Sequence, residues 1–500
     1  MKKILNILLV ILLSFSLLIG CSSDKLIEQE SDTSINNTQV NRFNKHSSEN
    51  VLGFNNLDED LINTDKVMDI IKELSSEKYK GRLAGTEGNE LAVSYMVDYF
   101  KEIGLENPKG IKDYKQYFLQ SVKITNDVPV LQIIDKNGNV ITEYEYLKDF
   151  NPVVNNNLSL SGSIEGAMYY INDPGQINKN NKKIKDKILV ISKETVDKMG
   201  LSNFLKQISQ SDMEIKGAII ERNFMSVSPH PINNKTLSNR PICTYFNPQK
   251  FNDIAEKAKA QAKIRLSIDY SYQKLEIPNV IGVIQGADKE LKDEYIVICG
   301  HLDHLGDNKN GTYNPGALDN ASGAACVMEI ARILNINKVK PKKTIVFIGF
   351  NGEEEGLFGS RHYVNNPLYP LKNTKVINLD MVGSKRKVPL YISTADKNGN
   401  NLRDELYKYA GYLGINSKKH FSQASDHAPF HYSGTESVLL IHLDKESGYH
   451  TPRDTIENID KDRIKEVIKL VLYYLDKKAY WAKQLVLCPS KYMQFIKLKF

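Results

Sequence analysis

The 500-residue sequence has few cysteines and little net charge, and each scarcity excludes a class of protein. The spacing of its cysteines is not that of a disulfide framework, and two of them, Cys299 and Cys326, lie in apolar surroundings that suit small core residues. The net charge of +6 is mild for this length, and no basic helix with interleaved aromatic residues occurs. The composition therefore gives no indication of nucleic-acid binding.

Long hydrophobic runs are also absent, except at the N-terminus, where Lys2 and Lys3 precede the apolar run 4–19. A positive end before a short apolar core is typical of a secretory signal, so we predict a signal peptide over residues 1–20. The string LIGC, which ends at Cys21, resembles a bacterial lipobox, although Cys21 could be incidental to an ordinary signal peptide. The lipobox implies a lipid on Cys21 and a location on the extracellular face of the bacterial cell membrane. No other run is long enough to span a bilayer.

Changes in composition divide the rest of the chain. Residues 21–62 are rich in Ser, Asn, Asp and Glu, so we expect a disordered tether. Helical periodicity over 63–112 predicts an N-terminal helical part of the main domain, with one helix capped by Thr64 and a second ending near Gly104. Short β-rich runs separated by turn residues over 113–275 predict an inserted β-rich domain, in which no cluster of His, Asp and Glu occurs.

Strand and helix patterns alternate over residues 276–485. The expected strands are NVIGVIQG, EYIVICGHLD, KTIVFIGFN, TKVINLD, VPLYIST and ESVLLIHL, and the expected helices follow Asp319, Gly356, Asn400 and Asp460. This alternation predicts an α/β fold, with a mainly parallel mixed sheet covered by helices on both faces. Such a sheet binds ligands at the carboxyl ends of its strands. The tail 486–500 mixes apolar residues with lysines, and its role stays open.

Ligand-type side chains gather where these strands end. The strings CGHLDHLG, GALDNASG, NGEEEGLFGS, INLDMVG and GYHTPRDT carry the candidate metal ligands His301, Asp319, Glu354, Asp380 and His450. Imidazole and carboxylate groups together suit zinc. Two zinc ions about 3.5–4 Å apart need a shared ligand, and Asp319 is the candidate for a bridging carboxylate. The sequence therefore predicts a site for two Zn²⁺ ions.

Three further residues complete the predicted site. Asp303 lies two residues after His301 and is expected to orient that imidazole. Glu353 precedes the candidate ligand Glu354 and is expected to act as a general base toward a water molecule. Tyr449 is available to stabilise an oxyanion. A single acidic residue is most often a solvated surface group, but five ligand-type residues at the strand ends of one α/β unit indicate a hydrolase.

These strings, together with SDHAPF at Ser425–Phe430, resemble metallopeptidase family 28, the dizinc aminopeptidases. The string RLAGTEGNELAVSYMVDYF near the N-terminus is also similar to that family's opening. Among the three consecutive glutamates, the following Gly356-Leu357 and Gly359-Ser360 fix the register and leave Glu355 as an extra residue. The segment 113–275 resembles a protease-associated domain through its strand texture and the string RPICTYF, which implies a lid or a substrate-selecting role.

The resemblance implies the zinc-peptidase fold and a role for each site residue. It implies that His301 and Asp380 bind one zinc ion, that Glu354 and His450 bind the other, that Asp319 binds both, and that Glu353 is the general base. Tyr449 matches an oxyanion-stabilising tyrosine found in some members.

The function that follows is an extracellular, membrane-anchored zinc metallo-aminopeptidase that removes N-terminal residues from peptide substrates. The alternatives are a metallo-carboxypeptidase or glutaminyl cyclase of the same fold, and a non-catalytic binding module. Cyclase relatives work with one zinc ion and non-catalytic relatives lose ligands, whereas this chain retains all five ligands and the base. The further helical domain usual in carboxypeptidase relatives is not evident. The sequence leaves the preferred N-terminal residue and the oligomeric state open.

Overall fold

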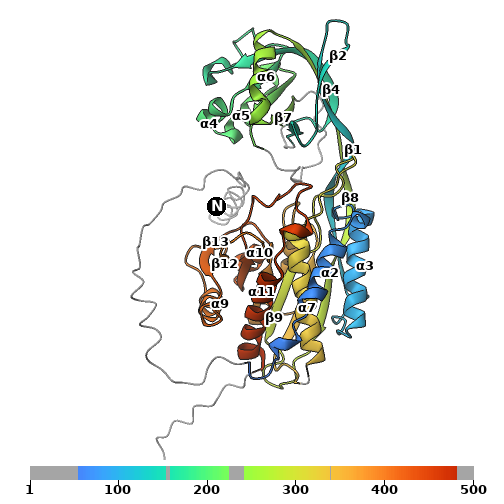
Figure 1. Ribbon diagram of the computed structural model, residues 1–500, viewed down its shortest axis with the longest axis vertical. Helices are drawn as coiled ribbons and strands as arrows, with labels where there is room; N and C mark the ends of the chain where they lie inside the picture. Colours follow the sequence, from blue (N-terminus) through green and yellow to red (C-terminus); the bar gives the residue numbers. More distant parts are fainter. Residues whose placement is uncertain (1–53, 154–157, 224–240, 338, 481–500) are drawn as a thin grey trace, which may run out of the picture.

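The computed structural model describes residues 54–153, 158–223, 241–337 and 339–480, so the expected signal peptide, most of the expected tether and the C-terminal tail lie outside it. A smaller body, at the top of Figure 1, is joined to a larger one by two long strands, β1 (Lys115–Ile134) and β8 (Lys263–Ile284). The two strands pair antiparallel along nearly their whole length. Within the described ranges, we find no helix that combines the length and the apolar character needed to cross a bilayer.

The larger body is built on a mixed sheet in the order β13-β12-β14-β11-β9-β10-β8. Its strands besides β8 are β9 (Tyr295–His301), β10 (Thr344–Phe350), β11 (Thr374–Leu379), β12 (Leu390–Thr394), β13 (Ser417–Phe421) and β14 (Glu436–Ile441). The neighbours from β10 through β9 and β11 to β14 are parallel, whereas β8 and β12 run antiparallel to β10 and β14. The predicted mainly parallel mixed sheet is confirmed.

Helices cover both faces of this sheet, as predicted. Along β9, Ile296 and Ile298 point into one cluster of buried residues, and Val297 and Cys299 point into another. The first cluster lies under α2 (Thr64–Leu74), α3 (Glu87–Glu102), α7 (Ser322–Ile336), α9 (Asn401–Tyr412) and α11 (Lys461–Leu475). The second lies under α8 (Phe358–Asn365) and α10 (His427–Tyr432). Cys299 and Cys326 are buried free thiols, which confirms their expected place in the core.

The N-terminal part of the fold begins earlier than expected. The backbone N–H groups of residues 55–57, which we placed in the tether, donate to the buried carboxylate of Asp476 at 2.7–3.2 Å. We expected Thr64 to cap α2, but Thr64 is its first residue and its cap is Asn63, whose side-chain oxygen accepts a hydrogen bond from the backbone of Lys66. The carboxamide of Asn63 thus accepts a backbone N–H of the first helical turn from the residue before the helix, which is the usual capping geometry.

The smaller body is an α/β unit with its own buried clusters. Three of the β-rich runs expected over 113–275, GAMYYI, KILVIS and GAIIE, lie in β4 (Ser161–Ile171), β5 (Ile188–Ile191) and β6 (Gly217–Glu221). The parallel pairing continues to β7 (Ile242–Phe246). The helices α4 (Lys193–Met199), α5 (Leu201–Ile208) and α6 (Pro248–Lys259) were not anticipated. The expected strand NVIGVIQG is not a separate element, because it continues β8 out of the smaller body into the larger sheet.

Candidate metal centre

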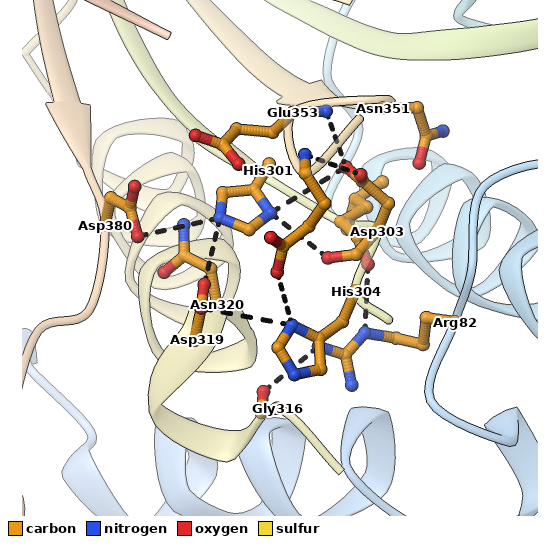
Figure 2. A network of polar contacts seen from close by, with 12 residues as sticks. Arg82, His301, Asp303, His304, Gly316, Asp319, Asn320, Asn351, Glu353 and Asp380 are labelled. Atoms are coloured by element: carbon orange, nitrogen blue, oxygen red, sulfur yellow. Dashed lines mark hydrogen bonds and ion pairs between the residues drawn. The ribbon is translucent and has the colours of Figure 1, made fainter. Parts of the chain in front are cut away.

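The five predicted ligands meet at the carboxyl edge of the larger sheet. They are His301 at the end of β9, Asp319 in the turn Ala317–Ala321 before α7, where its backbone is not helical, Glu354 after β10, Asp380 after β11 and His450 between β14 and α11. The strands β9 and β10 pair in register, with Phe350 beside His301. The loops that follow these two strands therefore leave the sheet side by side, and Figure 2 shows their side chains facing one another.

His301 faces two carboxylates. Its Nε2 atom lies 3.3 Å from Asp319 Oδ1 and 3.6 Å from Asp380 Oδ1. A tetrahedral zinc ion with bonds of about 2.0–2.2 Å holds its ligand atoms about 3.3 Å apart. Among the described residues, the buried His301 Nε2 and Asp380 Oδ1 atoms have no hydrogen-bond partner. The three groups therefore have the spacing, the donor types and the unpaired atoms that suit a zinc ion.

The other oxygen of Asp319 faces a second group of ligand type. His450 Nε2 lies 3.1 Å from Asp319 Oδ2 and 3.1 Å from Glu354 Oε2. Asp319 thus presents one oxygen to each group, which is the arrangement that a bridging carboxylate requires. Because both groups have the spacing of zinc ligands, the residues present fit two ions.

The buried carboxylates create a negative potential at the carboxyl edge of the sheet, which favours the binding of cations. Burial alone would raise the pKa of Asp319, but the neighbouring imidazoles of His301 and His450 outweigh it and hold that pKa well below its usual range. Burial would lower the pKa of His450, but the negative charges of Glu354 and Asp319 raise it to about 10. A proton on the imidazole and a metal ion therefore compete for the same place, so metal binding must release protons.

Glu353 lies at the same edge. One of its carboxylate oxygens belongs to a group of possible ligand atoms, with His301 and Asp380, that all lie within 4.8 Å of one another. Burial raises the pKa of Glu353 well above its usual range, and the neighbouring carboxylates of Asp380 and Glu354 raise it further. A carboxylate in such a place accepts a proton more readily than an exposed one.

Asp303 supports both His301 and the loop after β10, but not in the expected way. The close partner of His301 Nδ1 is the backbone carbonyl oxygen of Asp303, at 3.1 Å, and the carboxylate is 3.7 Å away. That carboxylate instead accepts hydrogen bonds from the backbone N–H groups of Glu353 and Glu354, each at 3.3 Å. Asp303 therefore orients the imidazole through its backbone and fixes the Glu353–Glu354 peptide through its side chain.

Tyr449 lies beside the ligands. Its ring stacks on the imidazole of His450, with centroids 3.7 Å apart and an angle of 24° between the planes. Burial raises the pKa of Tyr449 well above its usual range, and the carboxylates of Asp319 and Glu354 raise it further. The phenol therefore keeps its proton and can act as a hydrogen-bond donor.

Several residues that the sequence did not identify hold the site from outside. The Asp454 carboxylate accepts the backbone N–H groups of Leu318 and Asp319 at 2.9 and 3.0 Å. The Ser425 hydroxyl donates to Asp380 Oδ2 at 2.6 Å. Both residues belong to strings that were identified in the sequence, GYHTPRDT and SDHAPF. The strings indicated that these segments are near the site, but they did not indicate the roles of Asp454 and Ser425.

Arg82, in the string RLAGTEGN, is fully buried and links the N-terminal helices to the site loops. Its guanidinium donates to backbone carbonyl oxygens at 2.6–3.0 Å, in Leu74, Leu302, Pro315 and Gly316. Burial lowers the pKa of Arg82 to about 10, which the surrounding carboxylates oppose. Figure 2 shows this side chain beside His304 and Gly316.

Residues 279–475, which contain all five predicted ligands, match the model of peptidase family M28. The aminopeptidase YwaD of Bacillus subtilis is 37% identical over 205 residues, which are 39% of this chain and 43% of that protein. The probable glutamate carboxypeptidase VP8 of Zea mays is 27% identical over 219 residues, which are 39% of this chain and 29% of that protein. The matched segments thus span less than half the length of these curated relatives.

Solved structures share the fold over most of the chain. An aminopeptidase from Aneurinibacillus sp. strain AM-1 has a TM-score of 0.63 at 24% identity, covering 85% of this chain and 96% of that one. The zinc aminopeptidase BSAP from Bacillus subtilis has a TM-score of 0.60 at 23% identity, with coverage of 85% and 96%. At these identities the likeness establishes a common architecture.

Proposed function

We propose that this chain is a zinc aminopeptidase of peptidase family M28, which removes residues from the free N-termini of peptides. The observation that carries the proposal is the position of Asp319, which offers one oxygen to His301 and the other to His450 at ligand spacing. The family match of residues 279–475, and the aminopeptidases among the similar proteins, support the same reaction.

The proposed ligands divide into two sets. His301 and Asp380 would hold one zinc ion, Glu354 and His450 would hold the other, and Asp319 would bind both. When bound, the two ions would polarise the scissile carbonyl and lower the pKa of a water molecule. The spacing of the ligand atoms and the unpaired atoms of His301 and Asp380 support this division.

The chain's own residues move the protons. Glu353 takes a proton from the attacking water and passes it to the leaving amine, as a general base and then a general acid. Asp303 keeps Glu353 in place by binding its backbone N–H group. Tyr449, protonated and beside His450, donates to the oxyanion of the tetrahedral intermediate.

We further propose that the chain is exported and held by a lipid on Cys21 at the extracellular face of the membrane. The smaller body would act as a lid or a substrate selector over the site. The signal-like residues 1–21 support the anchoring, and they lie outside the described residues. Replacing Cys21 with Ala should move the processed protein from the membrane fraction to the medium, and unchanged membrane association would contradict the anchor.

The test of the activity uses residues 22–500, which retain every described element. Peptides with free or acetylated N-termini are incubated with the protein, with and without a chelator, and their masses are followed over time. We expect chelator-sensitive loss of residues from the free N-terminus only. Trimming from the other end would indicate a carboxypeptidase, and loss of ammonia from an N-terminal Gln a cyclase. No reaction in protein that carries two metal ions would favour a binding role.

A further inference from the structure

A third imidazole lies at the site, and none of the roles above uses it. His304 stands on the loop after β9, three residues beyond His301, and is fully buried. Its Nδ1 atom lies 2.6 Å from Glu354 Oε1 and 4.0 Å from Asp319 Oδ2. Figure 2 shows the ring of His304 below Asp303 and beside Asp319, pointing into the cluster.

The distances separate the role of His304 from that of His450. Ligand atoms of one tetrahedral zinc ion stand about 3.3 Å apart, which is close to the 3.1 Å between His450 Nε2 and Glu354 Oε2. The 2.6 Å between His304 Nδ1 and Glu354 Oε1 is instead the length of a charge-assisted hydrogen bond. Glu354 therefore turns one oxygen toward His304 and the other toward His450.

The surroundings of His304 hold its ring in this position. A Cβ atom on Gly316 would lie 2.6 Å from His304 Cδ2 and 2.7 Å from its Cγ, so only glycine allows the ring to pack there. The carbonyl of Gly316 accepts a hydrogen bond from Arg82 Nη2 at 3.0 Å. The backbone N–H of His304 donates to the carbonyl of Arg82 at 3.2 Å. Arg82 thus fixes both the His304 backbone and the turn against which its ring packs.

We propose that His304 is a positioning residue whose Nδ1–H binds Glu354 Oε1 and leaves only Oε2 to coordinate metal. This inference rests on the proposed metal site. Partners of this kind typically change metal affinity by 10- to 100-fold. The ion assigned to His301 and Asp380 has separate supports, in the backbone of Asp303 and the hydroxyl of Ser425, so it should respond little to a change at His304.

The experiment compares His304→Leu, which removes the donor, with His304→Asn, whose side-chain amide nitrogen takes the place of imidazole Nδ1. Competition with a chelator measures the affinity of residues 22–500 for both zinc ions. In His304→Leu we expect about 10- to 100-fold weaker binding of one ion and nearly unchanged binding of the other, with most of the loss restored in His304→Asn. The control is His362→Leu on α8, where the ring stacks on Phe118 and its Nδ1 atom pairs with Asn366 instead of a proposed ligand, so both affinities should stay unchanged.

Four results would overturn the inference. Two unchanged zinc affinities in a folded His304→Leu protein would show that the contact does not support the metal. An equal loss in His304→Asn would show that the ring, and not its donor, matters. The third measurement is NMR of the wild-type zinc protein with ¹⁵N-labelled histidine, which stays informative if His304→Leu does not fold. We expect a protonated Nδ1 in His304. A metal-shifted Nδ1 resonance would instead show that His304 is a ligand. Wild-type protein that binds no zinc would overturn the proposed function as well.

Discussion

Replacing Glu353 with Gln removes a proton acceptor and keeps nearly the same shape. The site holds no obvious substitute, because the facing oxygens of Asp319, Glu354 and Asp380 lie 3.1–3.6 Å from imidazole nitrogens. The carboxylate of Asp303 is also engaged by two backbone N–H groups. A general base contributes about 10²- to 10⁴-fold, and with no second base we expect kcat to fall by about 10³- to 10⁴-fold. That loss corresponds to about 4–5.5 kcal/mol in the activation free energy.

The assay uses the peptide that the wild-type chain trims fastest and determines kcat and KM for both proteins. Because Glu353 is not a proposed ligand, the variant should still bind two metal ions, and KM should change little, as expected when an interaction of the transition state alone is lost. The control is Glu446→Gln, an exposed residue paired with Arg386, where kcat should be that of the wild type. Near-normal kcat in Glu353→Gln with two ions bound would refute the assignment of the base.

Other positions give further predictions. Asp319→Ala removes the oxygen offered to each proposed ion, so the metal content should fall from two per chain toward none, and two retained ions would exclude a bridge. Arg82→Met leaves the buried carbonyl oxygens of Leu74, Leu302 and Pro315 without their donor, at about 1–3 kcal/mol each, so thermal unfolding should show a Tm lower by about 3–10 °C, and an unchanged Tm would contradict this. Burial lowers the pKa of His442 to about 3, below the usual 6.5 or so of an unfolded chain, so its contribution to stability is lost as the pH falls from about 6.5 toward 3. His442→Asn, whose oxygen can accept the Gly383 N–H that His442 Nδ1 accepts at 2.8 Å, should weaken this pH dependence in urea unfolding, and equal slopes would count against it.

The larger sheet could be predicted because the spacing of apolar residues in the sequence indicates which faces of its strands and helices are buried. The stripe of α11, with Ile464, Val467 and Ile468 among its buried residues, was visible in the sequence at helical spacing. Only the end of β8, NVIGVIQG, was expected as a strand, because the burial of β8 changes along its length. It alternates where it forms the ribbon with β1, and it is buried on both faces after Asn279, where it enters the sheet.

The candidate ligands could be predicted because each follows a strand of one parallel sheet, and such ends meet at one edge. The residues that support the ligands could not be predicted, because their partners are far away in the sequence and their spacing has no helical or strand periodicity. Arg82 reaches the carbonyl of Gly316 across 234 positions, and Asp454 reaches the backbone of Asp319 across 135. His304 was visible in the string GHLDHLG, but only the three-dimensional path of the loop shows that it faces Glu354.

Glu355 shows the same limit at the junction of the two bodies. The register of the glycines separated it from the proposed ligands, and its side chain is 1% exposed and accepts a hydrogen bond from Gln120 Nε2 on β1. Lys123, three residues along β1 and also buried, lies 4.9 Å above the ring of Tyr270, which belongs to the core of the smaller body. The loop that carries the proposed base, Glu353, is therefore held by Asp303 on one side and by the paired strands β1 and β8 on the other. The second support exists because Gln120 of β1 donates a hydrogen bond to Glu355, and this contact cannot be read from the sequence.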